Sequence, residues 1–208
     1  MNKELQKRIL SSVILLPLAL YFILAGSFYF TFFTIICFFV SAYEWIKMVK
    51  KTEFKIIGTI FLFFSFYTFY DISKDNLGIW FFIFLVCIST DIGGYIFGKL
   101  FKGPKLIKIS PNKTYSGMIG GYLLSLIFLS IFMDWINSRV NIDWFVVTIL
   151  ISTVSQIGDI IISYFKRLSK VKDTGKIIPG HGGLLDRIDG MIFAFPIFYL
   201  IELTYHLS

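Results

Sequence analysis

The stretch 163–189 concentrates the residues of this chain that could carry out chemistry. It reads SYFKRLSKVKDTGKIIPGHGGLLDRID and holds six basic residues, three aspartates and a Gly-His-Gly-Gly run. Asp186 and Asp189 lie three residues apart, so in a helix they would share one face. A loop that only oriented a membrane protein would carry Lys and Arg alone. The mixture of charges predicts a bound polyphosphate, held by basic side chains, with carboxylates holding its Mg²⁺.

The composition of the chain is that of an integral membrane protein. Of its 208 residues 56% are hydrophobic and 16% are charged, whereas soluble domains carry about 25% charged residues. The predicted fold is all-α, a single membrane domain with N-terminal spans in 1–80 and catalytic spans in 81–208. Apolar runs approaching the ~20 residues that cross a bilayer predict seven spans, at 9–25, 27–43, 56–70, 77–98, 117–133, 144–165 and 188–205.

The basic residues predict the orientation of these spans. With the N-terminus in the cytoplasm, 18 of the 20 Lys and Arg residues fall in cytoplasmic segments, and only Lys74 and Arg139 lie outside. We therefore expect a multi-pass protein of the cell (inner) membrane with its C-terminus outside. Its two long cytoplasmic loops, 99–116 and 166–187, would hold the active site. The net charge of +7 then reflects topology, and no nucleic acid is expected as a partner. The first span resembles a signal peptide, but its apolar run is long for one and we expect it to stay uncleaved.

Acidic residues inside a bilayer cost about 2.5–3.5 kcal/mol on insertion scales and usually have a function. Asp91 and Asp159 lie toward the cytoplasmic ends of predicted spans, each beside glycine; for Asp91 a structural carboxylate is the alternative. Glu44 closes the second span next to Trp45, and this pair is interpreted as an interfacial anchor. Oxygen ligands without a Cys or His cluster favour Mg²⁺ over zinc. The carboxylates expected on the cytoplasmic side are Asp91, Asp159, Asp173, Asp186 and Asp189.

Basic side chains beside these carboxylates are expected to neutralise phosphate oxygens during a transfer reaction. His181 lies between glycines, and we expect it either to contact the substrate or to be structural. The basic residues with the expected phosphate role are Lys166, Arg167, Lys172 and Arg187.

The loop before the predicted span 117–133 offers a second set of polar residues. Ser110 or Ser116 is expected to cap the helix that follows, whose N-terminus would favour an anion. Lys113 and Tyr115 are expected to contact a phosphate and a base or ribose. Taken alone, this pattern has low specificity.

The run 163–189 resembles the signature of the phosphatidate cytidylyltransferase (CDP-diacylglycerol synthase) family. The similarity includes SxFKR, KDxG and IPGHGGLLDRID in unbroken order. The Asp91-containing span, a Ser-Pro-x-Lys-Thr box at 110–114 and Gly158 before Asp159 are similar as well. The resemblance covers residues 85–195, and the N-terminal spans more loosely.

The resemblance implies that CTP and phosphatidic acid react to give CDP-diacylglycerol and pyrophosphate, for phospholipid biosynthesis at the lipid bilayer. It implies Mg²⁺ as the cofactor, with a second cation as an option, and a homodimer as the assembly. The implied catalytic residues are Asp159, Lys166, Arg167, Lys172, Asp186 and Arg187. The implied metal ligands are Asp159 and Asp186, with Asp189 as a helper. The implied substrate-binding residues are Ser110, Lys113, Thr114, Asp173, His181, Gly182, Gly183 and Asp91.

The chain departs from the family pattern at a few positions. Asn112, Tyr115 and Ser116 stand where the family box commonly has a basic residue, a Trp and a Glu, and Gly190 stands where Ser is frequent. The chain is also shorter than many members, and we expect a complete catalytic half on a reduced scaffold.

Two other functions are compatible with the sequence. A CTP-dependent lipid or polyprenol kinase would transfer the γ-phosphoryl group and release CDP. A membrane transporter is the alternative that is not an enzyme, because intramembrane Asp residues often mark ion paths. A transporter should place its charges near the midplane, often in two matched halves, whereas here they gather at one face and no repeat is visible.

Overall fold

The computed structural model describes residues 21–22, 24, 27–107, 110, 113–180 and 182–205. Over these residues it is helical, with two isolated β-bridges and no strand. The predicted span 9–25 lies outside the described residues except at 21–22 and 24, and so does His181.

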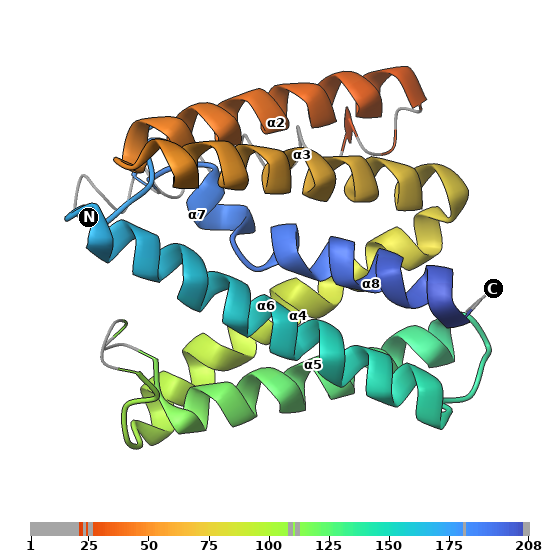
Figure 1. The fold of residues 1–208 in the computed structure, drawn as a ribbon. Helices are drawn as coiled ribbons and strands as arrows, with labels where there is room; N and C mark the ends of the chain where they lie inside the picture. Colours follow the sequence, from red (N-terminus) through yellow and green to blue (C-terminus); the bar gives the residue numbers. More distant parts are fainter. Residues whose placement is uncertain are drawn as a thin grey trace. The chain divides into compact units, whose positions relative to one another are not determined.

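Helices make up most of the described part of the chain, as predicted (Figure 1). Five helices in the described part are long and apolar enough to cross a membrane, and α8 is a shorter apolar helix. The protein is therefore a polytopic, all-α membrane protein. The helices are α2 (Ser27–Met48), α3 (Thr52–Asp75), α4 (Leu77–Phe101), α5 (Tyr115–Trp135), α6 (Ile142–Leu168), α7 (Leu185–Ile188) and α8 (Met191–Tyr205).

The chain forms two compact units. Unit 1 comprises Met1–Tyr70 and Phe165–Ile188, and unit 2 comprises Asp71–Tyr164 and Asp189–Ser208. Unit 1 thus joins α2 and most of α3 to the charged stretch that follows α6. Unit 2 holds α4, α5, α8 and most of α6.

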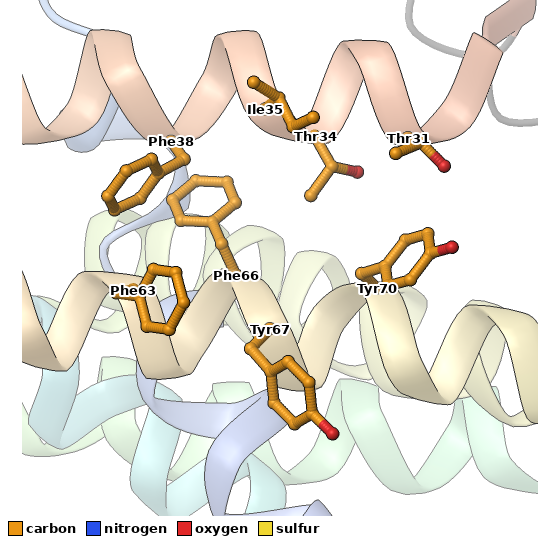
Figure 2. Close-up of a pocket in the computed structure, with 8 residues that line it drawn as sticks. All are labelled: Thr31, Thr34, Ile35, Phe38, Phe63, Phe66, Tyr67 and Tyr70. Carbon is orange, nitrogen blue, oxygen red and sulfur yellow. The ribbon is translucent and has the colours of Figure 1, made fainter. Parts of the chain in front are cut away.

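Aromatic side chains pack α2 against α3 in unit 1. The rings of Phe30 and Phe69 stack with centroids 5.6 Å apart, and Phe38 meets Phe66 edge to face at 6.0 Å. Between the two helices lies a cavity of about 180 Å³, and Figure 2 shows Phe38 of α2 and Phe66 of α3 among the side chains that line it. Its lining carries no charged side chain, so the cavity suits hydrocarbon and offers nothing that would hold a polyphosphate. It is lined by Thr31, Thr34, Ile35, Phe38, Phe63, Phe66, Tyr67 and Tyr70.

Glycines bring α4 and α5 together in unit 2. A Cβ on Gly93 would collide with the backbone carbonyl of Gly120, and a Cβ on Gly117 would lie 2.8 Å from the carbonyl oxygen of Gly94. Small residues allow this close approach of apolar helices, which have no hydrophobic driving force for association in lipid. Gly93, two residues after Asp91, therefore serves helix packing.

Candidate functional site

The basic end of α6 leads directly into the loop of the signature. The backbone N–H of Val171 donates to the carbonyl of Lys166 over 2.9 Å, and that of Lys170 donates to the carbonyl of Arg167 over 3.0 Å. Lys170 has a φ of 58°. These features form a Schellman motif, which ends a helix and reverses the chain. The loop that follows is thereby anchored next to the last turn of α6.

Asp186 is the centre of the first cluster, which we call the Asp186 cluster (Glu44, Lys166, Thr174, Asp186 and the backbone of residues 183–185, all in unit 1). The Lys166 ammonium donates to Asp186 Oδ1 over 2.7 Å, and the two side chains are only 11% and 7% exposed. Asp186 Oδ2 accepts from the backbone N–H of Thr174 over 2.8 Å and from that of Gly183 over 3.0 Å. The Thr174 hydroxyl lies 3.0 Å from the same oxygen. The carboxylate is therefore engaged on both oxygens.

These contacts set the charge state of Asp186. Burial alone would raise the pKa of its carboxyl, but the hydrogen bond from Lys166, those from Gly183 and Thr174 and the charge of Lys166 together lower it below its ordinary value. Hydrogen bonds to the charged form favour ionisation. Asp186 is thus a carboxylate at neutral pH and keeps Lys166 paired.

Glu44 is part of the same cluster. Its side chain is almost fully buried, at 1% exposure. Glu44 Oε1 accepts from the backbone N–H of Leu184 over 3.0 Å, and Oε2 accepts from that of Leu185 over 2.9 Å. The Thr174 hydroxyl lies 3.2 Å from Oε2. The interpretation of Glu44 as an interfacial anchor is therefore wrong, because its charge is satisfied inside the protein.

Trp45 is also buried rather than anchored at an interface. It is 5% exposed, and its indole N–H donates to the carbonyl of Phe54 over 3.0 Å. Its ring meets Phe165 edge to face at 4.9 Å. The interpretation of Trp45 as an interfacial anchor is wrong as well, since α2 continues to Met48 and packs this face inside unit 1.

The glycines of the signature make room for these carboxylates. Gly182 has a φ of 91°, a conformation that favours glycine. A Cβ on Gly183 would collide with the Thr174 hydroxyl and the Glu44 carboxylate, and a Cβ on Gly175 would collide with the same carboxylate. The family resemblance implies substrate contacts for Gly182 and Gly183. The structure shows close approach to the protein's own acidic side chains, and the substrate contacts of Gly182 and Gly183 stay predictions.

Other charged residues of the stretch lie at the surface of unit 1. Arg167, Lys172, Asp173 and Arg187 are exposed, and the Arg167 guanidinium donates to the carbonyl of Val171 over 3.3 Å. Exposed guanidinium and ammonium groups can reach phosphate oxygens, whereas Lys166 is held by Asp186. The structure thus separates one buried cation from the exposed ones.

A second cluster, the Asp159 cluster (Lys113, Gln156, Asp159 and Ser163), lies in unit 2. The Lys113 ammonium is 2.6 Å from Asp159 Oδ2, with side-chain exposures of 21% and 32%. It also lies 3.5 Å from the backbone carbonyl of Gln156, and the Ser163 hydroxyl donates to Asp159 Oδ1 over 3.3 Å. The predicted loop 99–116 and the predicted span 144–165 thus supply one member each to an ion pair, and the basic member already neutralises the acidic one.

Thr114 caps α5. Its hydroxyl accepts from the backbone N–H of Gly117 over 3.1 Å and lies 3.0 Å from the Ser116 hydroxyl. The expectation that Ser110 or Ser116 caps this helix is wrong, because α5 begins one residue after Thr114. Ser110 is partly exposed in the preceding loop.

Two further carboxylates of the prediction lie elsewhere in unit 2. Asp91 is exposed on α4. Asp189 is 9% exposed, and its carboxylate accepts from the backbone N–H of Gly190 over 3.0 Å.

Comparison with known proteins agrees with the signature. The model of the cytidylyltransferase family matches residues 6–72 and 54–204. The chain belongs to the cytidylyltransferase family.

Several relatives are phosphatidate cytidylyltransferases of staphylococci. The chain is 41% identical to that of Staphylococcus haemolyticus over 164 residues, which cover 74% of this chain and 63% of the relative. It is 42% identical to that of Staphylococcus saprophyticus over 135 residues, covering 64% and 52%. It is 38% identical to that of Staphylococcus aureus over 164 residues, covering 74% and 63%. The chain thus spans less than two thirds of the length of these relatives.

The carboxylates can be tested for their fit to the Mg²⁺ that cytidylyl transfer implies. Among the described residues no group of three or more His, Cys, Asp and Glu side chains is placed to hold a metal. Mg²⁺ usually takes one or two carboxylates together with waters and substrate phosphates, so the donor set fits a metal that arrives with a nucleotide. Asp159, at 32% exposure, would have to release Lys113 from Oδ2 to bind such a metal. Asp186 would have to release one of its donors to bind one directly.

Proposed function

We propose that the protein is a phosphatidate cytidylyltransferase, which transfers the cytidylyl group of CTP to phosphatidic acid. The observation that carries the proposal is the match to the cytidylyltransferase family over 6–72 and 54–204, which includes the whole signature. The names of the staphylococcal relatives support this choice of lipid substrate.

In this reaction an oxygen of the lipid phosphate attacks the α-phosphorus of CTP, and the bond to the β-phosphate breaks to release pyrophosphate. The lipid supplies the nucleophile, so the protein has to align the substrates and stabilise charge. We assign phosphate contacts to the exposed Arg167, Lys172 and Arg187. Lys166 is assigned to the same phosphates from the buried side, with Asp186 fixing its ammonium.

The rest of the nucleotide site is assigned from the resemblance. Asp173, His181, Gly182 and Gly183 would contact the nucleotide, and Ser110, Lys113, Thr114 and Asp91 are assigned to substrate binding. Lys113 would leave Asp159 for a phosphate when substrate binds, since an ammonium exchanges one anion for another at little cost when partly exposed.

We further propose that Mg²⁺ accompanies CTP, with Asp159, Asp186 and Asp189 as its candidate ligands and a second cation as an option. Bound Mg²⁺ would supply charge neutralisation at the triphosphate. The exposure of Asp159 favours it as the direct ligand.

The finer features of the assembly are proposals too. Seven spans, a cytoplasmic N-terminus and a C-terminus outside are supported by the distribution of Lys and Arg. The active site would then face the cytoplasm of a cell whose inner membrane holds the protein, and we propose a homodimer.

The test is an assay of the protein in detergent with CTP labelled at the α-phosphate, phosphatidic acid, and Mg²⁺ or EDTA. We expect Mg²⁺-dependent label in the lipid fraction, reduced at least tenfold in Asp159→Asn. Label that stays in CDP while the lipid gains an unlabelled phosphate would replace the proposal by the lipid kinase. No turnover of either kind by folded protein would reject both and leave the transporter.

A further inference from the structure

We propose that Glu44 is a positioning residue of the nucleotide site. Its carboxylate fixes the backbone of residues 183–185 and, through Thr174, orients the Asp186 carboxylate that holds Lys166. The consequence for catalysis rests on the proposed function, whereas the effect on the loop can be measured without it.

The hydrogen bonds to Glu44 use both oxygens of its side chain as acceptors. Its three hydrogen-bond partners in the described structure are all donors: the N–H groups of Leu184 and Leu185 and the hydroxyl of Thr174. These donors contact both side-chain oxygens of Glu44, so each oxygen acts as an acceptor. A Gln side chain has one acceptor and two N–H donors, and would place an N–H group against an N–H or O–H group.

The packing leaves Glu44 no alternative position. The side chain is 1% exposed, and Gly175 and Gly183 bring backbone against the carboxylate where any Cβ would collide with it. An unpaired N–H group at this buried position cannot hydrogen-bond to solvent, and leaving a buried donor unsatisfied is costly. The loop therefore takes its position from a residue of α2.

Thr174 connects Glu44 to the charged pair. Its hydroxyl lies between Glu44 Oε2, at 3.2 Å, and Asp186 Oδ2, at 3.0 Å. It has one hydrogen, so it can donate to only one carboxylate at a time. The backbone N–H groups of Thr174 and Gly183 hold the same Asp186 oxygen, and Asp186 in turn holds Lys166. Loss of the Glu44 carboxylate thus reaches the Lys166 ammonium through two intervening residues, Thr174 and Asp186.

The experiment compares the full chain in detergent with Glu44→Gln and with Glu53→Gln. The control removes one negative charge from the exposed first turn of α3, which also lies in unit 1. The first measurement is amide hydrogen exchange in peptides covering 173–188, without nucleotide. The second is the steady-state kinetics of cytidylyl transfer, with kcat and KM for CTP and for phosphatidic acid determined separately.

We expect Glu44→Gln to exchange at least tenfold faster in 183–186 while peptides of α4 and α5 stay as in wild type. Its kcat should fall tenfold to a hundredfold, since misplacement by about 1 Å can cost 10²-fold. The KM for phosphatidic acid should stay within twofold. Glu53→Gln should match wild type in both measurements.

Gly175→Ala is a second, independent variant. Its new methyl group would displace the Glu44 carboxylate, although residue 44 is still a glutamate. It should reproduce the faster exchange in 183–186, and it decides the question if Glu44→Gln does not fold. Wild-type exchange in 183–186 together with wild-type kcat in the folded variant would overturn the inference. If wild-type protein lacks cytidylyl transfer, the proposed function fails, while the exchange data still decide whether Glu44 holds the loop.

Discussion

The ion pair of Lys166 and Asp186 should stabilise unit 1 strongly, and a double-mutant cycle can measure this. The perturbations are Asp186→Asn, Lys166→Met and the two together. Both side chains are nearly buried, at 7% and 11% exposure, and the N–O distance is 2.7 Å. Removing one partner of a buried pair costs about 3–5 kcal/mol, because the other charge is left without compensation.

The two single variants should differ in cost. In Asp186→Asn the amide oxygen can keep the donors from Thr174 and Gly183, but its NH₂ group faces the Lys166 ammonium, so we expect a loss of about 3–5 kcal/mol. In Lys166→Met the carboxylate keeps its other donors, so we expect the loss of one charged hydrogen bond, about 1.5–3 kcal/mol. The double variant contains no orphaned ammonium. It should be less destabilised than the sum of the singles, with a coupling of about 2–3 kcal/mol.

The assay is equilibrium unfolding of the full chain in mixed micelles with increasing dodecyl sulfate, followed by tryptophan fluorescence. Trp45 is a suitable probe, since its ring packs 4.9 Å from that of Phe165, the residue before Lys166. The control is Lys172→Met, which removes an exposed cation from the same loop and should change the free energy of unfolding by less than about 0.5 kcal/mol. Additivity of the two single variants within about 0.5 kcal/mol would refute the reasoning, because independent sites add to that precision.

Three other outcomes follow from the described contacts. The lowered pKa of Asp186 means that its carboxylate stabilises the fold at pH values above its ordinary pKa of about 4, and that this contribution is lost as the pH falls through the folded pKa. The difference in unfolding free energy between wild type and Asp186→Asn should therefore be constant from pH 6 to 8 and shrink below pH 4. A difference that stays constant at acidic pH would contradict this prediction. Lys113→Met should cost at most about 1 kcal/mol of stability, since its pair with Asp159 is partly exposed. The same variant should lower kcat/KM for CTP at least tenfold. A small loss of stability together with an almost unchanged kcat/KM would exclude Lys113 from the substrate site. Gly93→Ala should destabilise the protein by about 1–3 kcal/mol through overpacking, whereas Gly94→Ala should be tolerated, because its Cβ would lie 3.7 Å from the carbonyl oxygen of Gly117. Thermal unfolding of the two variants side by side checks this, and equal midpoints would argue against the α4–α5 contact.

The apolar helices could be predicted because hydropathy acts locally along the chain. Six of the predicted spans correspond to described helices, although several helices run past the apolar runs that predicted them. The second span was expected to end at 43, whereas α2 continues to Met48. The extension includes Glu44 and Trp45, whose polar groups are satisfied by tertiary contacts. A hydropathy criterion ends a span at such residues because it cannot include partners far away in the sequence.

The candidate site was predictable to the extent that its chemistry lies in one stretch of sequence. The charged residues of 163–189 stood out by type and spacing, and Lys166 and Asp186 are indeed adjacent in space. Glu44 was missed because the groups that bind it lie 130 to 141 residues further along the chain, and two of the three are backbone N–H groups, which any residue could provide. The one signal in the sequence was indirect. Gly175 and Gly183 leave space for the Glu44 carboxylate. The presence of a glycine in the sequence does not identify the side chain that occupies this space. The same reasoning explains why a Glu at the end of a membrane helix can indicate a tertiary contact and not an interfacial anchor. An acidic side chain on a helix that packs inside the protein needs hydrogen-bond donors, and the backbone N–H groups of a glycine-rich loop can provide them.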